Sequence, residues 1–417
     1  MNDAAPRLLV LGAGREALPI LQALKVLGCH LAVLDGVPDA PGFRVADAGL
    51  LASTFDEEST VEAARAYAAR ARLDGVLGTA RRVGPAAAMV ADALGLPGPS
   101  LAAARCIADR LAMKGRLRAA GIAVPWSARV CGPSALRQIA GATRQPLVVK
   151  PVDGWAARGV VRLLKGVDLA WAHRVALLSS PSGRAMVEAY AEGRQLTVVT
   201  LVSRGTVAVV DVAERCTEAH ERFAPFVLDA GHERPAVLSA GQHVALEALL
   251  RASIEALAVD DAVVTSEVVL GPNGPILVDL EIGLTGGRCL THEIPLATGI
   301  DVIGAALRLA LGEPLSGEAL APRWLRPVAE RAVFGTPGTV VAVRDAELAA
   351  QDDGITLVEM LVAPGSRVLP PTSNLCQGGA VVATGESRDQ AVARAVAAAS
   401  RIRIVTTAGR PPRPLDS

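Results

Sequence analysis

Short apolar runs alternate with longer amphipathic stretches over the first hundred residues. Apolar strands and helices are predicted in turn at residues 8–11, 16–27, 31–34, 59–72, 75–77 and 85–94. Such an alternation is typical of a doubly wound sheet of parallel strands with helices on both faces. We therefore expect residues 1–97 to form one α/β domain.

From Pro99 onward the pattern becomes a mixture of shorter strands and helices. It predicts a helix over residues 100–120, which is basic over 109–120, and then strands and helices at 146–149, 196–202, 206–212 and 242–257. Pro322 and Pro327 lie at the next boundary, so residues 98–325 are expected to form a second region.

The remaining residues predict a smaller α+β domain over 326–405. Its clearest elements are a strand at 338–343 and a helix at 387–400. The last residues, 406–417, are rich in proline and arginine and are expected to form a flexible tail.

Two apolar-alternating runs flank the turn 271–275, which is typical of an antiparallel hairpin. Glu267 and Glu281 are at mirror positions about Gly274, so we expect their carboxylates to face each other. The opposite face is predicted to be apolar and carries Val268, Leu270, Ile276, Val278 and Leu280. Opposed like charges destabilise a sheet unless a cation lies between them, and carboxylates suit Mg²⁺. The alternative is a solvated edge strand whose acidic residues discourage aggregation.

Lysine is rare in this chain, and the few lysines are therefore informative. Lys25, Lys114, Lys150 and Lys165 are the four lysines, although lysine and arginine together number 42. Lys150 ends an apolar strand and precedes a loop containing Gly154 and Gly159, a pattern that favours phosphate binding by the ammonium and the loop amides. A lysine at the end of a buried strand is also expected to need a partner. Lys114 lies in the basic helix, where a solvated charge is the alternative.

Length and composition indicate an enzyme of several domains. The chain has 417 residues and a formal net charge of zero, which favours neither nucleic acid nor an anionic membrane as a partner. No apolar run is long enough to span a bilayer, and the start lacks a signal pattern. Six dispersed cysteines without a CxxC pair suggest reduced thiols, so a cytoplasmic location is expected.

The turn at residues 12–17 fits the GxGxxA pattern of dinucleotide-binding sites. Asp35 ends the second predicted strand, near the position of a ribose-binding acid. The turn alone is equally compatible with an NAD enzyme and with a tight strand-to-helix turn that binds no dinucleotide.

Taken together, these features resemble the ATP-grasp superfamily of carboxylate ligases over nearly the whole chain. The segments that carry the resemblance, besides the acidic hairpin, are 108–114 with 120–125, and 187–191. The resemblance implies a preATP-grasp domain at 1–97, which does not bind NAD in this superfamily. It further implies an ATP-grasp domain at 98–325, with a lid subdomain at about 122–190, and a C-terminal α+β domain.

The resemblance also implies roles for individual residues toward ATP and Mg²⁺, with Mn²⁺ as an alternative metal. Lys114 and Lys150 would hold the phosphates, and Glu267 and Glu281 would bind the metal. The lid loop would contain Asp153, Gly154, Arg158 and Gly159, whereas Glu188, the backbone near Ala191 and Gln195 would meet the base and the ribose. His232 resembles the histidine of a Gly-His turn near the phosphates, with a plain surface histidine as the alternative.

The run 281–288 departs from the family pattern. The family commonly has asparagine and arginine where this chain has Gly283 and Thr285, and Ala157 replaces a common lid serine. Glycine has no side chain to coordinate a metal, and threonine has no bidentate clamp. Arg288 is therefore the candidate for gripping the substrate carboxylate or the acyl phosphate, with a loop-capping role as the alternative.

The implied activity is ATP-dependent formation of a C–N bond. The substrate carboxylate would be activated as an acyl phosphate and then attacked by an amine, with small-molecule substrates and a possible homodimer. The C-terminal part resembles the closing domain of L-amino-acid ligases, which favours an amino acid as the acid. The alternatives are a carboxylase-type enzyme that activates bicarbonate and a catalytically weak nucleotide-binding homologue.

Overall fold

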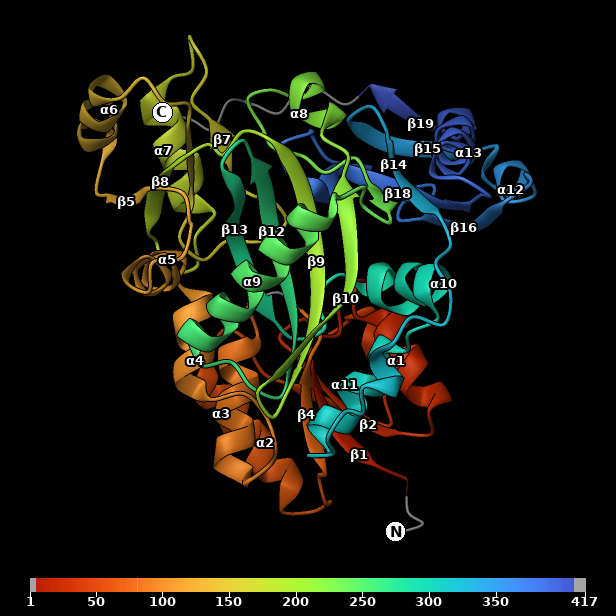
Figure 1. Ribbon diagram of the computed structural model, residues 1–417. Helices are drawn as coiled ribbons and strands as arrows, with labels where there is room; N and C mark the ends of the chain where they lie inside the picture. Colours follow the sequence, from red (N-terminus) through yellow and green to blue (C-terminus); the bar gives the residue numbers. More distant parts are fainter. Residues whose placement is uncertain (1–4, 81, 409–417) are drawn as a thin grey trace. The chain divides into compact units, whose positions relative to one another are not determined.

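The computed structural model describes residues 5–80 and 82–408, and these form two compact units (Figure 1). Unit 1 contains the residues up to 124 together with 197–212 and 238–325. Unit 2 contains 125–196, 213–237 and the residues from 326 onward. The region expected at 98–325 thus contributes segments to both units.

Unit 1 contains the predicted doubly wound sheet. Its four parallel strands have the order β3-β2-β1-β4, with β1 at Arg7–Leu11, β2 at His30–Asp35, β3 at Ala48–Leu51 and β4 at Gly75–Gly78. The helices are α1 (Leu18–Val26), α2 (Glu57–Ala68) and α3 (Gly84–Leu94). The predicted fold class is confirmed, although β3 is too short and too rich in small residues for the pattern to have predicted it.

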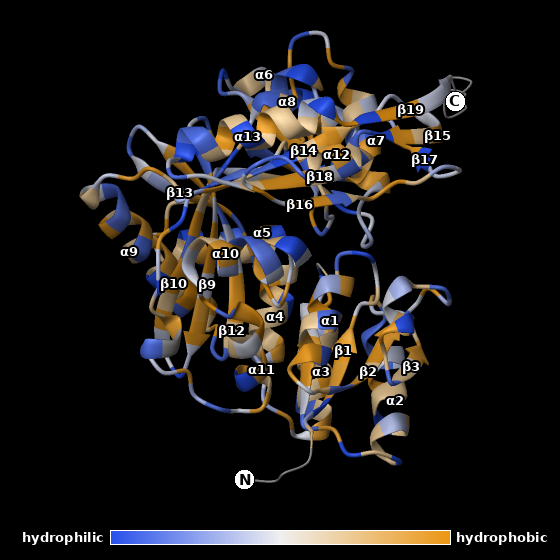
Figure 2. Cartoon of the chain, turned by 90° about the vertical axis from the view of Figure 1, so that its right-hand side faces the viewer, coloured by the Kyte–Doolittle hydropathy of each residue, from blue (hydrophilic) through white to orange (hydrophobic). Residues whose placement is uncertain are grey.

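Strict alternation along β1 builds two apolar cores, one on each face of this sheet. Leu8 and Val10 belong to a core shared with α1, whereas Leu9 and Leu11 belong to a core shared with α2 and α3. Figure 2 shows the hydrophobic character of β1 and β2. Burial on both faces explains why each central strand reads as a continuous apolar run.

The helix expected over residues 100–120 is interrupted at Asp109, where its basic part begins. The interruption separates α4 (Leu101–Ala108) from α5 (Arg110–Ala119). Asp109 has an extended backbone, and its carboxylate accepts hydrogen bonds from the amides of Leu111 and Ala112 at 2.9 Å each. Aspartate is a preferred N-terminal cap, so a side chain that starts α5 also ends α4.

An antiparallel sheet completes unit 1. Strand β12 (Ala262–Gly271) pairs with β13 (Gly274–Ile282) and lies next to β9 (Arg194–Ser203), which is followed by β10 (Thr206–Arg215). Of β9 and β10, residues 197–212 belong to this unit. The helices are α9 (Ala240–Leu257), α10 (Ile294–Thr298) and α11 (Val302–Ala310).

Two short helical turns of unit 1 border the candidate site described below. Residues Pro41–Arg44 form a 3₁₀ turn, η1, and residues Cys289–Glu293 form a π-helical turn, η2, which precedes α10.

Unit 2 begins with a four-stranded sheet of order β5-β8-β6-β7. The strands are β5 (Ser127–Val130), β6 (Leu147–Pro151), β7 (Val161–Arg162) and β8 (Ala185–Ala189). Helices α6 (Pro133–Ala142) and α7 (Leu169–Leu178) pack on it through a shared apolar core. Strand β6 extends one residue beyond Lys150, the expected strand-end lysine.

The rest of unit 2 contains two further sets of strands. In the first, β11 (His232–Arg234), β14 (Val328–Phe334), β18 (Gln377–Thr384) and β16 (Ile355–Met360) are neighbours in that order. In the second, β15 (Gly338–Arg344) lies between β17 (Arg367–Val368) and β19 (Arg403–Ala408). The helices are α8 (Glu218–Arg222), α12 (Ala346–Ala349) and α13 (Arg388–Arg401).

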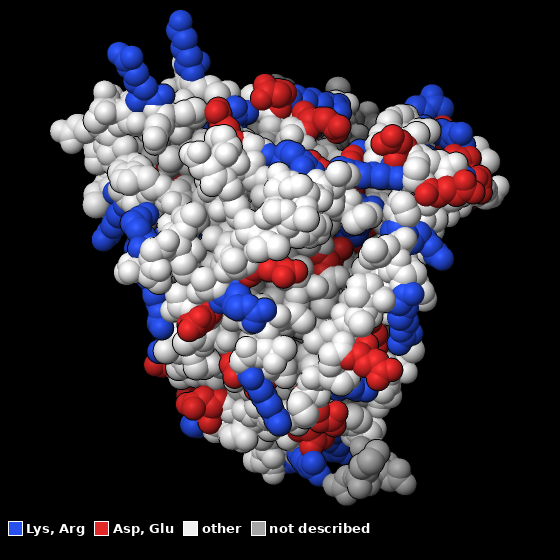
Figure 3. Space-filling view, in the orientation of Figure 1, with Lys and Arg blue, Asp and Glu red and all other residues white. Residues whose placement is uncertain are grey.

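Residues 406–408, expected in the tail, belong to β19, and residues 409–417 lie outside the described part of the chain. Among the helices that the structure describes, none combines the length and apolar character needed to cross a membrane. On the face shown in Figure 3, basic and acidic side chains are interspersed, which agrees with the formal net charge of zero.

An ion-pair network attaches α13 to β10 and β11 within unit 2. Glu214 and Glu233 are register partners on these strands, so their like charges need compensation. Arg194 donates two hydrogen bonds of 2.7 Å to Glu214, and Arg388 of α13 binds Glu214 at 2.7 Å and Glu233 at 2.6 Å. The hydrogen bonds from Arg194 and Arg388 lower the pKa of Glu214 to about 2, although burial opposes this.

We predict that Glu214→Gln lowers stability by about 2 kcal/mol at pH 7, because Arg194 loses its carboxylate partner and Arg388 keeps only Glu233. The folded-state pKa lies below the ordinary value, so the contribution of Glu214 is present above about pH 4.5 and disappears as the pH falls toward 2. Thermal unfolding of the two proteins at pH 7 and pH 3 tests this. Glu192→Gln, at an exposed position of the same unit, is the control. An equal difference between wild type and Glu214→Gln at both pH values would contradict the prediction.

Candidate active site

The hairpin of β12 and β13 has a different register from the expected mirror about Gly274. Gly271 pairs with Gly274, so Pro272 and Asn273 form a two-residue turn, and a bulge follows Glu267 on the paired ladder. As a result Glu267 opposes Asp279 and Glu281 opposes Thr265. The predicted direct pairing of Glu267 with Glu281 is therefore wrong, because the tight turn and the bulge both shift the register.

The acidic face carries a third carboxylate that the sequence argument passed over. Asp279 is the register partner of Glu267 and lies two residues before Glu281, so all three acids lie on one face. Asp279 and Glu281 are buried, and Glu267 is half-buried. Thr265, the register partner of Glu281, is buried, and its hydroxyl has no hydrogen-bond partner among the described residues. A two-residue spacing from Glu281 was the signal that could have identified Asp279.

Arg110, the first residue of α5, neutralises Asp279. Its Nη2 and Nε atoms lie 2.7 Å and 2.9 Å from the same carboxylate oxygen, and both side chains are buried. Burial favours a lower pKa for Arg110, but Asp279 outweighs it, with further contributions from Glu281 and Glu267, so the pKa is raised. Arg110 thus engages Asp279, while the expected metal role of Glu267 and Glu281 stays a prediction.

Arg82, in the loop after β4, approaches the same acidic face. Its Nη1 donates to the carbonyls of Ile107 and Ala108 at 3.2 Å and 2.7 Å, at the end of α4. Its Nε lies 3.7 Å from Glu281 and its Nη2 lies 3.8 Å from Asp279. The sequence argument did not identify Arg82, because nothing in the local pattern connects residue 82 with a hairpin two hundred residues later.

Lys114 also contacts the hairpin and is fully buried. Its ammonium donates to the carbonyl of Val278 at 2.6 Å, and Val278 is the extra residue of the bulge. The interpretation of Lys114 as a solvated charge is therefore wrong. Its expected role toward phosphate stays a prediction.

In unit 2, Lys150 forms a buried ion pair with Glu188. Its Nζ lies 2.7 Å from Glu188 Oε1, and little of either side chain is exposed. Glu188 opposes Val148 and Lys150 opposes Met186 on the paired strands, so the two charges are diagonal neighbours on one face. A lysine at a buried strand end was expected to need a partner, and Glu188, assigned to the base from the resemblance, provides it.

The loop after Lys150 is shaped by close backbone approaches. Asp153 accepts a hydrogen bond from the amide of Ser182 at 3.0 Å and a short one from the Ser180 hydroxyl. A Cβ on Gly159, whose φ is +71°, would lie 2.6 Å from Ser179 Cβ. Gly154 lies in the same loop, and the Arg158 guanidinium lies 4.9 Å from the Trp155 ring centroid. Asp153 thus fixes the start of the loop, while its assignment to ATP stays a prediction.

The segment after Glu188 contains an aromatic contact that the sequence argument did not predict. The Arg162 guanidinium lies 4.7 Å from the ring centroid of Tyr190, and the Tyr190 hydroxyl lies 3.4 Å from His220 Nδ1. Burial raises the pKa of Tyr190, and a hydrogen bond with Gln195 opposes this. Ala191 and Gln195 are half-buried. Gln195 is thus placed next to Tyr190.

His232 is a half-buried member of an ion-pair cluster in unit 2, which is more than the alternative of a plain surface histidine implies. Its Nδ1 lies 2.9 Å from Glu330, and its Nε2 lies 3.5 Å from Asp229, which also pairs with Arg215 at 3.3 Å. Burial opposes protonation of His232, but Asp229 and Glu330 outweigh it and raise its pKa. The geometry favours an imidazolium at neutral pH.

The run 281–288 is packed closely against the parallel sheet within unit 1. The amide of Leu284 donates to the carbonyl of Gly78 at 2.8 Å. Gly283 has a φ of +108°, and a Cβ there would lie 3.0 Å from the same carbonyl, whereas a Cβ on Gly287 would lie 2.4 Å from the carbonyl of Glu16. The two glycines allow this approach, which gives a physical reason for the absence of asparagine at 283.

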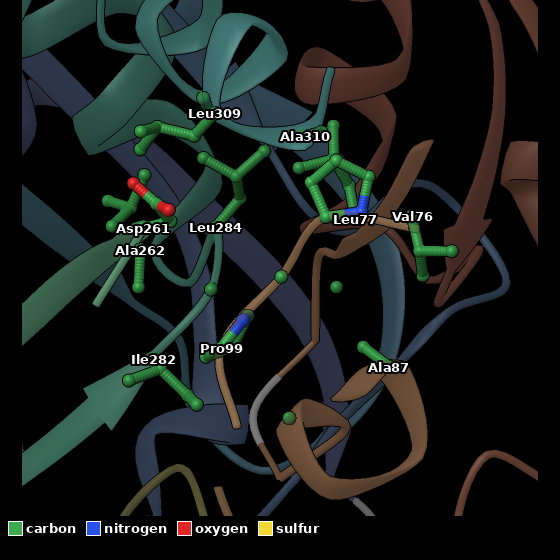
Figure 4. Close-up of a pocket in the computed structure, with 17 residues that line it drawn as sticks. Val76, Leu77, Ala87, Pro99, Asp261, Ala262, Ile282, Leu284, Leu309 and Ala310 are labelled. Carbon is green, nitrogen blue, oxygen red and sulfur yellow. The ribbon is translucent and has the colours of Figure 1, made fainter. Parts of the chain in front are cut away.

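A cavity of about 60 Å³ lies beside this run (Figure 4). Ile282, Leu284, Leu309 and Pro99 contribute to an apolar lining in which Asp261 is the charged residue. Such a lining does not suit phosphate or a metal ion.

Arg288, the expected substrate clamp, lies with its Nε 3.7 Å from the buried Glu293. Thr285 is buried, and its hydroxyl has no hydrogen-bond partner among the residues that the structure describes. The structure thus connects Arg288 with the start of α10, and its role toward a substrate stays a prediction.

The glycine turn at 12–17 has the geometry of a tight structural turn. The Asp35 carboxylate accepts hydrogen bonds from the amides of Ala13 at 2.7 Å and Val37 at 2.9 Å. The amide of Gly42, in η1, donates to the carbonyl of Ala13 at 2.8 Å. The acid expected at a ribose thus binds its own turn, which favours the interpretation without a dinucleotide.

Comparison with known proteins gives matches to ligases and transferases. Residues 332–407 match the family model described as L-amino acid ligase C-terminal domain 2. An L-amino acid ligase from Bacillus licheniformis superimposes with a TM-score of 0.82 at 20% identity, over 97% of this chain and 100% of that chain. A carboxyaminoimidazole ribonucleotide synthase from Aspergillus clavatus, complexed with ATP, gives 0.75 at 19% identity, over 96% and 99%.

Among curated proteins, a formate-dependent phosphoribosylglycinamide formyltransferase from Burkholderia lata is 25% identical over 97% of both chains. The first three curated relatives are matched over only 60%, 50% and 63% of their own lengths. The structural similarities show the fold. The curated relatives add a transferase to the ligase and the synthase found among the solved structures.

We predict that the pH dependence of stability above neutrality depends on His232. Because its folded-state pKa is raised, its contribution is complete below about pH 6.5 and is lost as the pH rises through the raised value. His232→Gln should lower the free energy of unfolding at pH 7 by about 2–4 kcal/mol, and the thermal midpoint with it. It should also flatten the decline of the thermal midpoint between pH 7 and 9.

His220→Gln is the matched control, because burial lowers the pKa of His220 to about 4 and keeps it neutral over this range. A decline in the His232→Gln protein as steep as in wild type would contradict the assigned charge. Asp229, Glu330, Arg215 and Arg234 are unchanged in both variants.

We predict that restoring asparagine by Gly283→Asn destabilises the protein by about 1–3 kcal/mol and does not strengthen Mg²⁺ binding. The reason is the positive φ and the nearby carbonyl of Gly78. Gly115→Ala, where a Cβ meets nothing within 4 Å, is the control and should be neutral or stabilising. Tighter Mg²⁺ binding by Gly283→Asn at unchanged stability would refute this account.

Proposed function

Because the chain has the fold of the ATP-grasp enzymes, we propose that it is an ATP-dependent ligase that joins a small carboxylic acid to an amine. The observation that carries the proposal is the acidic face of the β12–β13 hairpin, where Glu267 and Glu281 remain suited to a metal after Arg110 has engaged Asp279. Relatives that span nearly the whole chain and the C-terminal match at residues 332–407 support the same reaction class.

The proposed reaction has two steps. A carboxylate oxygen of the substrate forms a bond to the γ-phosphorus of ATP while the bond from that phosphorus to the bridging oxygen breaks, which gives an acyl phosphate and ADP. The amine nitrogen then bonds to the acyl carbon, inorganic phosphate leaves, and the amine proton passes to solvent. The first step needs positioning and cations more than proton transfer.

Unit 1 supplies the metal-binding acids in this proposal. Glu267 and Glu281 would hold Mg²⁺, with Mn²⁺ as an alternative, through the carboxylate oxygens that these ions prefer. The buried Thr265 hydroxyl beside Glu281 fits a water or an oxygen ligand there. The metal would neutralise charge on phosphate oxygens. Lys114, held through the bulge carbonyl of Val278, would add a cation beside the acids.

Unit 2 supplies the second set of nucleotide-binding residues. The buried pairing with Glu188 fixes the position of Lys150, so its ammonium can hold a phosphate without first losing side-chain freedom. Arg158 and the backbone between Gly154 and Gly159 would cover the phosphates. Gln195 and the backbone near Ala191 would meet the ribose and the base.

His232 and Arg288 have different prospects as catalytic groups. The carboxylates of Asp229 and Glu330 favour the protonated form of His232 and raise its pKa, so we assign it an electrostatic role as a cation held by these two acids. Arg288 remains the candidate for binding the substrate carboxylate, provided that this carboxylate competes with Glu293.

We favour an amino acid as the acid substrate. The match of residues 332–407 to the L-amino acid ligase model supports this choice. The near full-length similarity to formate-dependent transferases makes formate the second candidate, and bicarbonate is the third. The discriminating experiment measures ADP release with each acid alone and with each acid combined with amines. Release that requires bicarbonate but no amino acid would favour the carboxylase alternative.

We predict that Glu281→Gln abolishes ADP release in the presence of both substrates and weakens Mg²⁺-dependent stabilisation by ATP. An amide in place of the carboxylate removes the charge that binds the metal. Glu313→Gln, at an exposed position of unit 1, is the control. Full turnover in Glu281→Gln would remove the proposed metal role. Stabilisation by Mg²⁺-ATP without ADP release in wild type, with every acid and amine, would favour the catalytically weak homologue.

A further inference from the structure

We propose that Arg82 is a catalytic residue that contacts the transferring phosphoryl group and replaces the arginine absent from position 285. The inference rests on the proposed function, because it assigns a new residue to the same reaction. Arg82 lies in the loop after β4, outside the run 281–288 in which the family pattern has its arginine. Four properties of Arg82 and its surroundings support it.

The first property is the shape of the run itself. Leu284 is hydrogen-bonded to the carbonyl of Gly78, and Gly287 lies so close to the carbonyl of Glu16 that a Cβ would be 2.4 Å from it. Thr285, between them, is buried. A side chain as long as arginine at 285 would have to displace packed atoms, so the cation must come from another element.

The same close approach brings the end of β4 next to the hairpin. Gly78 is the last residue of β4, and Thr79 fixes the following loop by donating to the carbonyls of Leu11 and Gly12 at 3.1 Å and 2.9 Å. Ligands of open α/β sheets commonly bind beyond the carboxyl ends of the strands. Arg82, four residues after Gly78, therefore starts from the edge of the sheet where a substrate is expected.

The second property is the way in which the guanidinium is held. Its Nη1 is anchored on the carbonyls of Ile107 and Ala108, where the negative end of the α4 dipole favours a cation. Its Nε and Nη2 point at Glu281 and Asp279 from 3.7 Å and 3.8 Å, which are ion-pair rather than hydrogen-bond separations. One edge of the guanidinium is thus fixed, and the other faces the proposed metal acids.

The third property is backbone strain. Arg82 has a φ of +71°, in the left-handed region that long side chains rarely occupy. Such a conformation costs of order 1–3 kcal/mol and persists where the surrounding structure or a function requires it. Here the strained backbone directs a long cationic side chain into a buried position, since only 5% of the side chain is exposed.

The fourth property is the charge balance of the acidic face. The three acids carry three negative charges, and Arg110, Arg82 and Lys114 are cations held beside them. Arg110 is committed to Asp279 by contacts of 2.7 Å and 2.9 Å, whereas Arg82 approaches Glu281, a proposed metal ligand. An anion bound through a metal at Glu281 would lie beside the carboxylate that Arg82 approaches. Arg288 has Glu293 as its ion-pair partner, at 3.7 Å.

In the reaction, Arg82 would stabilise the negative charge spread over the γ-phosphoryl oxygens while the bond to the bridging oxygen breaks and the bond to the carboxylate oxygen forms. It would donate hydrogen bonds and would neither lose nor gain a proton, because a guanidinium stays charged. Its planar fork suits oxygen atoms of a phosphoryl group better than an ammonium does.

The test compares Arg82→Gln, Arg82→Lys, Arg288→Gln and wild type in two measurements. The first is stabilisation against heat by Mg²⁺-ATP, by Mg²⁺-ADP and by Mg²⁺-ADP with aluminium fluoride, a mimic of the phosphoryl group in transfer. The second is the rate of ADP release. Arg116→Gln, which removes an exposed arginine of α5 in the same unit, is the matched control.

We expect Arg82→Gln to keep stabilisation by Mg²⁺-ATP within about twofold in apparent affinity while losing the extra stabilisation from aluminium fluoride. ADP release should fall by about 10²–10³-fold, the usual effect of removing one transition-state donor. Arg82→Lys should recover part of both, because it restores charge without the fork.

Several results would overturn the inference. One is that Arg82→Gln retains the extra stabilisation from aluminium fluoride, or that Arg288→Gln loses it instead. Another is that Arg82→Gln loses stabilisation by Mg²⁺-ATP and the extra stabilisation from aluminium fluoride to the same extent, which is the pattern of a purely structural role. Absence of any aluminium fluoride effect in wild type would also refute it. If wild type shows that effect but releases no ADP with any acid, the proposed ligase reaction fails, and the dependence of the effect on Arg82 still decides the inference.

Discussion

Compensation of carboxylates on one face of the β12–β13 hairpin is the constraint on which the candidate site depends. Glu267, Asp279 and Glu281 lie together, and such acids cannot be buried without cations. Arg110 binds Asp279 directly, and Arg82 approaches the face from the end of β4. The elements around the hairpin can be understood from this requirement: α5 begins at Arg110, α4 ends with the carbonyls that anchor Arg82, and the bulge offers its carbonyl to Lys114.

The departures from the family pattern acquire a physical meaning in this arrangement. Gly283 and Gly287 permit the run 281–288 to lie against the carbonyls of Gly78 and Glu16. A chain that packs so closely has no space for an asparagine and an arginine in the run. If Arg82 performs the role of the missing arginine, it explains both the absence of arginine at position 285 and the strained backbone at Arg82.

Unit 2 shows the same principle with other residues. Lys150 is buried with Glu188, His232 lies between Asp229 and Glu330, and Glu214 is paired with two arginines. Each charge has at least one partner from another element, such as Glu330 for His232 and Arg388 for Glu214. Side chains fixed in this way would lose little conformational freedom on binding a ligand.

The sequence by itself determined the elements whose pattern is local: the alternating strands and helices of the first hundred residues, the hairpin, and a strand-end lysine that needed a partner. Tertiary structure alone decided the register of the hairpin, because a tight turn and a bulge move Glu267 opposite Asp279. It also decided the partners of the buried charges. Arg82 and Glu281 are far apart in the sequence but close in space. Ion pairing depends on distance in space, whereas the periodicity of apolar residues shows only which face of an element is buried. The sequence pattern therefore could not predict this pair.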